Sequence, residues 1–391
     1  MAASLRHVIQ RTRSQIHPFV KTVSRCELRV TYQGKRFLFS REFLGLDNYE
    51  RQRMITADKL GDVKDKFCSR METYISGDDP GTVFTDDLKT MLHISSSQED
   101  FNITEKMFRE YLKQNEEMSM IQNFSFGPII MRLLYLLNKP DEACRLFLDP
   151  SLGGTFDNTS SFLLLLDKLY EEKQYKKVLE MFEVIQKKEL RGFKYPNDCT
   201  TLALASCYQM NSQESFERMM EIFVGCRERG AMLTQRSVSF ASLLALRQNR
   251  PDVSMELLVM KNEEKFVTNQ NLKAITLAHL GRYEEAIQIL KNTLQRDIPQ
   301  EFQRGNKIFS DTARELQKSV ESSNDPNLIR QLQTVIQRLA SGGHISEQTL
   351  HDFITKPIVK NRQLQTSFKS RRRSENFHPP EYKREGLTDM A

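Results

Sequence analysis

The sequence predicts an all-α protein, an α-solenoid of degenerate helix-turn-helix repeats, and three observations support this fold class. A five-residue piece with a polar centre between two apolar pairs recurs at 143–147, 178–182, 219–223, 254–258 and 286–290. Each copy follows a polar turn, and the copies are separated by about 35 residues, the length of a two-helix repeat. Proline and glycine are scarce, at 12 and 16 of 391 residues, and no regular alternation of apolar and polar residues indicates a large sheet.

The clearest helical hairpin lies at 277–290. Gly281 is expected to take the positive φ that ends the first helix of the hairpin. Tyr283, Ala286 and Leu290 then follow at helical spacing and form one apolar face. Because a single hairpin cannot bury such a face, neighbouring hairpins are expected to stack on one another.

The repeat array is predicted to run from residue 124 to residue 298. Each unit consists of a first helix and a second helix, and the second helix carries one of the recurring pieces. The first helices are expected at 125–137, 160–173, 198–209, 235–248 and 268–279.

The flanking segments are predicted to add further helices. An N-terminal helical region is expected over 49–123, after a linker at 27–48 that has no clear periodicity. Two amphipathic helices follow the array and form a C-terminal helical cap over 299–355, since the end of a solenoid needs a polar outer face. The longest wholly apolar run, 162–166, is far too short to span a membrane.

Residues 1–26 have the composition of a mitochondrial transit peptide. They carry several Arg and Lys residues, frequent hydroxyl residues and no Asp or Glu, and the apolar residues between Leu5 and Val23 can form one side of a helix. Segments of this composition direct proteins to mitochondria, so the mature protein is expected in the matrix. A disordered basic tail or an ordinary first helix are the alternatives.

Residues 356–391 are predicted to form a disordered basic tail. Aromatic residues such as Phe368 and Tyr382 are interleaved with the basic residues. Because arginine neutralises phosphate and aromatic rings stack on bases, this tail is a candidate for RNA binding. A solvated tail and a nuclear import signal are the alternatives. The candidate contacts are Lys369, Arg371, Arg372 and Arg373.

The arrangement of these features resembles the pentatricopeptide-repeat family. The resemblance covers 124–298 and includes connectors at Arg229 and Gly230 and at 195–198, which are similar to the basic-glycine and proline-aspartate endings of that family's repeats. Tetratricopeptide repeats have nearly the same length and usually bind peptides, and the stretch 280–286 fits both families.

The resemblance implies that the first helices hold single-stranded RNA, with about one base per repeat. In that family, a polar residue of the first helix and the residue that closes the preceding repeat contact one base. Counting back fifteen residues from the recurring pieces places the first role on Ser239 and Asn271. Thr234 is a closing residue, and Asn197 and Thr201 are candidates in the longer third unit.

Other positions depart from the family's pattern. Phe266 stands where a polar closing residue is expected, and the first two units place Pro128 and Leu163 at the base-reading position. Neither side chain can hydrogen bond to a base. General RNA binding is therefore expected in place of a base-by-base code.

The predicted function is that of a mitochondrial RNA-binding protein that affects the processing, maturation or stability of transcripts. As the resemblance implies, respiratory-chain expression depends on it indirectly, and separate nucleases or ribosome-associated proteins are possible partners. The alternative is a tetratricopeptide-like protein-binding scaffold or assembly factor in mitochondria. A Lys- and Arg-lined groove would favour RNA, and an apolar or peptide-shaped groove would favour the scaffold.

No catalytic or metal-binding pattern is present in the sequence. It contains no nucleophile with its base, no phosphate-binding glycine loop and no HExxH motif. The six cysteines form no CxxC pair and indicate reduced thiols, not a zinc site. The protein is therefore expected to be non-catalytic and to hold no cofactor.

Overall fold

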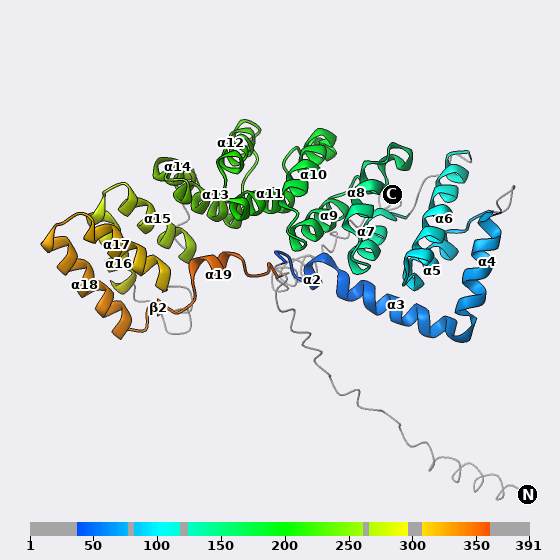
Figure 1. Cartoon of the computed structure of the whole chain (residues 1–391), viewed down its shortest axis with the longest axis horizontal. Coiled ribbons are helices and arrows are strands. Elements are labelled where there is room, and N and C mark those ends of the chain that lie inside the picture. Colours follow the sequence, from blue (N-terminus) through cyan, green and yellow to red (C-terminus); the bar gives the residue numbers. More distant parts are fainter. Residues whose placement is uncertain (1–36, 77–81, 118–123, 261–265, 296–306, 360–391) are drawn as a thin grey trace, which may run out of the picture. The chain divides into compact units, whose positions relative to one another are not determined.

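The fold is seen in a computed structural model of the chain (Figure 1). The described residues all belong to one compact unit of the chain. The predicted transit peptide, 1–26, and the candidate tail residues Lys369, Arg371, Arg372 and Arg373 lie outside the described residues. The structure describes residues 37–76, 82–117, 124–260, 266–295 and 307–359.

The middle of the chain forms a stack of helix pairs, which confirms the predicted α-solenoid (Figure 1). Each first helix packs against the first helix of the next pair, as the short connections of a two-helix repeat require. The pairs are α7 (Gly127–Leu136) with α8 (Pro140–Leu148), α9 (Thr159–Glu171) with α10 (Tyr175–Lys188), α11 (Asn197–Met210) with α12 (Gln213–Glu228), α13 (Gln235–Arg247) with α14 (Pro251–Met260), and α15 (Val267–His279) with α16 (Tyr283–Gln295).

The stack continues beyond the predicted array on both sides. Helix α3 packs on α5 and α5 on α7, while α15 packs on α17 and α16 on α18. The predicted N-terminal helical region and the first part of the predicted cap therefore repeat the same architecture. These helices are α3 (Leu46–Leu60), α4 (Lys64–Ser76), α5 (Thr85–Ile94), α6 (Gln98–Glu117), α17 (Ser310–Glu321) and α18 (Pro326–Ser341), and short 3₁₀ turns lie at Gly61–Val63, Pro150–Phe156 and Leu190–Gly192.

One turn geometry recurs where a first helix meets its second helix. Gly281 has a φ of 74°, as predicted, and the amide of Arg282 donates to the carbonyl of Leu277 at 2.9 Å. The turn after α13 repeats this bond between Arg250 and Ala245, also at 2.9 Å. A left-handed residue favours Gly or Asn, because other side chains clash with the following carbonyl. The equivalent left-handed residues are Asn138, Lys173, Asn211, Asn249, Gly281 and, after α17, Asn324.

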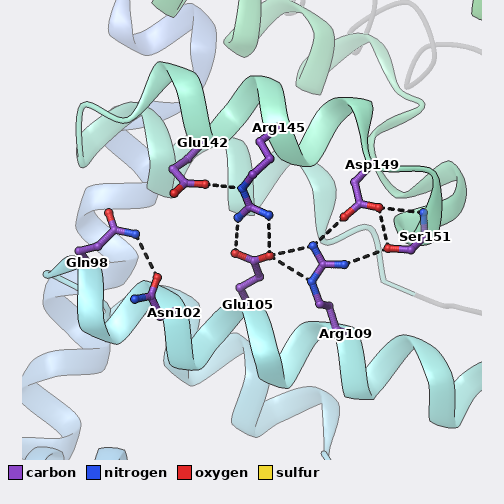
Figure 2. Close-up of polar contacts among 8 residues, drawn as sticks. All are labelled: Gln98, Asn102, Glu105, Arg109, Glu142, Arg145, Asp149 and Ser151. Carbon is purple, nitrogen blue, oxygen red and sulfur yellow. Dashed lines mark hydrogen bonds and ion pairs between the residues drawn. The ribbon is translucent and has the colours of Figure 1, made fainter.

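Second helices of neighbouring pairs are also joined by charge. Figure 2 shows the Glu105 carboxylate of α6 between the guanidinium groups of Arg145 on α8 and Arg109 on α6. The nearest N–O distances are 2.5 Å to Arg145 and 2.8 Å to Arg109, and Arg109 also pairs with Asp149 at 2.6 Å. Burial alone would raise the pKa of Glu105, but the two guanidinium groups lower it. This network therefore connects α6 to the array.

The structure corrects the predicted linker at 27–48 in its described part. Residues 41–44 form the short helix α2 (Arg41–Leu44), and α3 begins at Leu46. Leu38 and Phe39 are 0% and 1% exposed, and α2 packs on α9. This segment is ordered by burial against the array, which no local periodicity indicates.

After α18 the chain returns to the array instead of ending in a cap. Strand β2 (Ile345–Ser346) pairs in parallel with β1 (Ile308–Phe309), and α19 (Leu350–Ile354) packs on α13, α15 and α17. The chain then pairs Ile358 in parallel with Phe39. We call residues 345–359 the closing segment.

Candidate nucleic-acid interface

Three of the five residues predicted to contact RNA in the repeats share one cavity beside α11 and α13. Thr201 of α11 and Ser239 of α13 line a single cavity of about 360 Å³, together with Thr234 at the start of α13. We call this side of α11, α13, α15 and α17 the first-helix face. The remaining lining residues are Asp198, Gln235, Arg236, Phe266, Thr268, Phe353 and Ile358.

The hydroxyl groups of this cavity already have protein partners. Thr201 donates to the carbonyl of Asn197 at 2.8 Å and lies 3.0 Å from the hydroxyl of Thr234. Thr234 is the N-cap of α13 and accepts from the amide of Ser237 at 3.1 Å. Ser239, only 1% exposed, donates to the carbonyl of Gln235 at 3.0 Å. Thr201 and Thr234 each also lie 2.8 Å from the hydroxyl of Ser237, so these hydroxyl groups bind one another as well as the main chain. The fifth candidate, Asn197, is exposed at the start of α11.

Asn271 has a different environment from the other candidates. It is fully buried, and its amide nitrogen donates to the carbonyls of Val267 at 2.8 Å and Lys307 at 3.1 Å. Its oxygen accepts from the amide of Phe309 at 3.0 Å. In this conformation Asn271 therefore binds the main chain on both sides of Ile308, and its role in RNA contact stays a prediction.

The closing segment is held on the first-helix face at both ends of α19. At the carboxyl end, the Arg236 guanidinium of α13 donates to the carbonyls of Phe353, at 2.8 Å, and Ile354. At the amino end, the Asp311 carboxylate of α17 accepts from the amide of Leu350 at 2.8 Å. A cation at the carboxyl end and an anion at the amino end both complement the helix dipole.

A second cavity, of about 350 Å³, lies where α19 crosses the ends of α11, α13, α15 and α17. Arg247 donates to the hydroxyl of Tyr208 at 2.7 Å, and its guanidinium carbon is 4.1 Å from the centre of the Tyr208 ring. The same hydroxyl hydrogen bonds with Nδ1 of His351 at 2.7 Å. Sequence reasoning missed this cluster, because His351 lies far along the chain from both partners and none of them belongs to a motif.

The N-terminal part of the described chain meets the closing segment. The amide of Ser40 donates to the carbonyl of Ile358 at 3.0 Å, and the amide of Ile358 donates to Leu38 at 2.8 Å. Asp167 of α9 holds this junction by accepting from the amide of Phe39 at 3.2 Å and from the Tyr135 hydroxyl at 2.9 Å. The described chain thus covers its first helices from α9 to α17.

The charge of the covered face is mixed. The Thr201 cavity contains Arg236 and Asp198, and burial raises the pKa of Asp198. The Tyr208 cavity contains Arg247 together with Asp311 and Glu315. The face is therefore not lined uniformly by Lys and Arg, and apolar side chains such as Phe266, Phe353 and Leu246 also form the walls of its cavities.

The described ranges also bear on metal binding, membrane insertion and thiol chemistry. Within them, no group of three or more His, Cys, Asp or Glu side chains could hold a metal ion. In the same ranges, no helix combines the length and apolar character needed to cross a membrane. Burial raises the pKa of Cys207 and of Cys226 to about 12, so these thiols are protonated at neutral pH.

Comparison with known proteins points to one kind of relative. No protein-family model matches the chain. It is 25% identical over 338 residues to "Pentatricopeptide repeat-containing protein 2, mitochondrial" of Xenopus laevis, which covers 85% of each chain. The proteins of the same name from Pongo abelii and Homo sapiens are 26% and 24% identical, over 80% and 89% of this chain and 80% and 87% of their own.

The similarity extends well beyond the predicted array at 124–298, in agreement with the longer stack of helix pairs. Across at least 80% of its length, this chain resembles pentatricopeptide repeat-containing protein 2 of animal mitochondria.

Proposed function

We propose that the protein binds single-stranded RNA in the mitochondrial matrix and affects the processing, maturation or stability of transcripts. The observation that carries this proposal is the position of Thr201, Thr234 and Ser239, which come from two neighbouring units and line one cavity. The resemblance to mitochondrial pentatricopeptide-repeat proteins and the transit-like composition of 1–26 support the location and the class of ligand.

The hydroxyl groups of this cavity would bind the edge of a base by exchanging their present protein partners for it, since a hydroxyl can donate one hydrogen bond and accept two. Arg236 lines the same cavity and can bind a phosphate through its planar guanidinium group. The basic tail, with Lys369, Arg371, Arg372 and Arg373, would add attraction to phosphates that is independent of sequence.

We further propose that the protein acts without catalysis. It would hold a stretch of transcript, and so expose or shield a cleavage site for a separate nuclease. Respiratory-chain expression would then depend on it through the transcripts that it holds.

The test is crosslinking of the tagged protein to RNA in intact cells, followed by sequencing of the bound RNA. Ser239→Ala is expected to reduce the crosslinks to the preferred transcripts. Ser206→Ala is the matched control, since Ser206 is also buried and donates to the carbonyl four residues before it, at 2.8 Å, but does not line the cavity. An RNA yield equal to that of untagged cells would contradict the proposal.

A second candidate function is binding of a peptide by the same face, and one observation favours it. The Asn271 amide binds the main chain of residues 307 and 309, and Arg236 binds two main-chain carbonyls of the closing segment. Protein partners that remain bound after ribonuclease treatment, together with RNA at background level, would favour the scaffold.

A further inference from the structure

We propose that the closing segment is a displaceable strap. RNA binds the first-helix face after it displaces this strap from the helices. This inference rests on the proposed function, since it concerns how RNA reaches the same cavity. The conformation described here is then the closed state, in which the affinity for RNA is low.

The first argument is overlap between the strap and the proposed ligand. Phe353 and Ile358 line the cavity that Thr201, Thr234 and Ser239 also line. The Arg236 guanidinium, the cation of that cavity, is already bound by the carbonyls of Phe353 and Ile354. A base in the cavity would therefore need the space that Phe353 and Ile358 occupy. A phosphate on Arg236 would need the N–H groups that now donate to the strap.

The second argument is the access of solvent beside the strap. Cavities of about 350 and 360 Å³ lie beside α19, and both are open to solvent. The strap itself contributes Leu350, His351, Phe353 and Ile358 to their walls. The edge of the strap that faces these cavities is not packed against the helices, so it makes fewer dispersion contacts than a closely packed segment would make.

The third argument is that the strap has little structure of its own. Helix α19 has five residues and β2 has two, and so short a helix is not stable in isolation. Its order depends on a few contacts, chiefly Leu350 and Ile354, which are 1% and 0% exposed, and on the bonds from Arg236 and Asp311. Loss of some of these contacts would therefore release the remainder.

The Arg236 guanidinium keeps hydrogen-bond partners in this exchange. When the strap lifts, the carbonyls of Phe353 and Ile354 are hydrated by water. Phosphate oxygens then replace them on Arg236, and hydrogen bonds between ionised partners are stronger than those to neutral carbonyls. Binding of RNA and closure of the strap thus compete for the same guanidinium group.

A reducible lock tests whether the strap must move. Phe39 and Ile358 are paired partners at the end of the strap, and neighbouring strands place such residues at a separation that a disulfide can bridge. In the double variant Phe39→Cys/Ile358→Cys, oxidation is expected to weaken binding of a labelled single-stranded RNA at least tenfold, and reductant is expected to restore it. Each single variant, oxidised and reduced, controls for the loss of the native side chain and for the natural cysteines.

A variant with a weakened strap tests the converse, that easier opening raises the affinity for RNA. The substitution lies in the strap, so the first-helix face is unchanged. Leu350→Ala is expected to tighten RNA binding about tenfold, because the apparent dissociation constant falls as the open fraction rises. Leu339→Ala on α18 is the matched control, with a side chain 0% exposed but outside the strap. Both measurements use a background in which Lys369 and Arg371 to Arg373 are changed to Gln, so that the tail does not mask the effect.

The outcomes separate the two proposals. RNA binding that is the same in the locked, native and loosened forms overturns the strap and leaves the proposed function intact. RNA binding by none of the forms, including those with the native tail, overturns both. A locked form that binds RNA more tightly than the reduced form would also overturn the strap.

Discussion

The Asn271 carboxamide accepts a hydrogen bond from the Phe309 amide at 3.0 Å and donates to the Lys307 carbonyl at 3.1 Å. These bonds fix β1, which in turn pairs with β2 at the start of the closing segment. A side chain that the family resemblance assigns to a base is therefore an anchor for the covering chain in the closed conformation.

Asn271→Ala is expected to lower the free energy of unfolding by about 2 to 4 kcal/mol, because it leaves the buried amide of Phe309 without a partner and also removes the donor to the Lys307 carbonyl. Urea denaturation measures this change. Gln288→Ala, at an exposed position of α16, is the control and should shift stability by no more than about 0.5 kcal/mol. An Asn271→Ala protein with native stability would contradict the anchoring role.

Lys173→Gly is expected to stabilise the protein by roughly 1 kcal/mol. Lys173 has a φ of 60°, and in this left-handed conformation a Cβ atom lies too close to the following carbonyl oxygen, whereas glycine has no Cβ. The residue is exposed, so few contacts are lost. The reciprocal change, Asn249→Ala, should destabilise by a similar amount, whereas Asn249→Gly should be nearly neutral. Thermal unfolding of the three variants and the native protein measures the order of their stabilities. A Lys173→Gly protein that is less stable than the native protein would contradict the prediction.

The repeat architecture was predictable from sequence because each unit is local. Both helices and the turn of a unit are close in the chain, so apolar spacing and residues such as Gly281 were sufficient to predict the hairpins. The helices that became α17 and α18 were predicted, but their membership of the stack was not recognised, because α18 carries no copy of the five-residue piece that marks the second helices of the array.

The packing of the closing segment on the first-helix face was not predictable, because it is not local in the sequence. It depends on contacts between distant residues, such as Ile358 with Leu38 and Arg236 with Phe353. Two-residue strands and a five-residue helix leave no periodic pattern in a sequence. The repeat spacing assigned Ser239 to a first helix, whereas Thr201 was only a candidate in the longer third unit, where the spacing gave no secure position. The cavity that they share also depends on Phe353 and Ile358 of the closing segment, which the spacing did not indicate.

Neutralising the basic tail is expected to change the salt dependence of RNA binding. In the full chain with Lys369, Arg371, Arg372 and Arg373 changed to Gln, the slope of log K against log salt should become less negative by about 3. This value assumes that each cation neutralises one phosphate of a single strand. Titrations with labelled RNA at several salt concentrations measure the slope. An unchanged slope would place the phosphate contacts on the described helices.

The Glu105 network predicts a coupling between the second helices of neighbouring pairs. A double-mutant cycle with Glu105→Gln and Arg145→Ala is expected to give a coupling energy of about 0.5 to 1 kcal/mol, since Arg145 is partly exposed and solvent screens the pair. The coupling should decrease in high salt. Arg145 with Glu110, which do not pair in the described part, forms the control cycle and should show additive effects.

The junction of the two covering segments predicts a dependence of stability on pH. Asp167 is fully buried, accepts from the Tyr135 hydroxyl and the amide of Phe39, and lies near the Glu171 carboxylate. Burial raises its pKa from 3.8 to about 7. Between these values the folded protein keeps a proton that the unfolded chain has lost. Stability therefore falls as the pH rises towards 7, by up to about 1.4 kcal/mol per unit.

Asp167→Asn is expected to remove this dependence, because the amide keeps an acceptor for Phe39 and does not ionise. Urea denaturation from pH 5 to pH 8 measures the effect, and the free energies of the native and variant proteins should diverge as the pH rises. Parallel curves would mean that Asp167 is ionised throughout. The junction between Phe39 and Ile358 would then be held by a buried charge, and its strength would not change across this pH range.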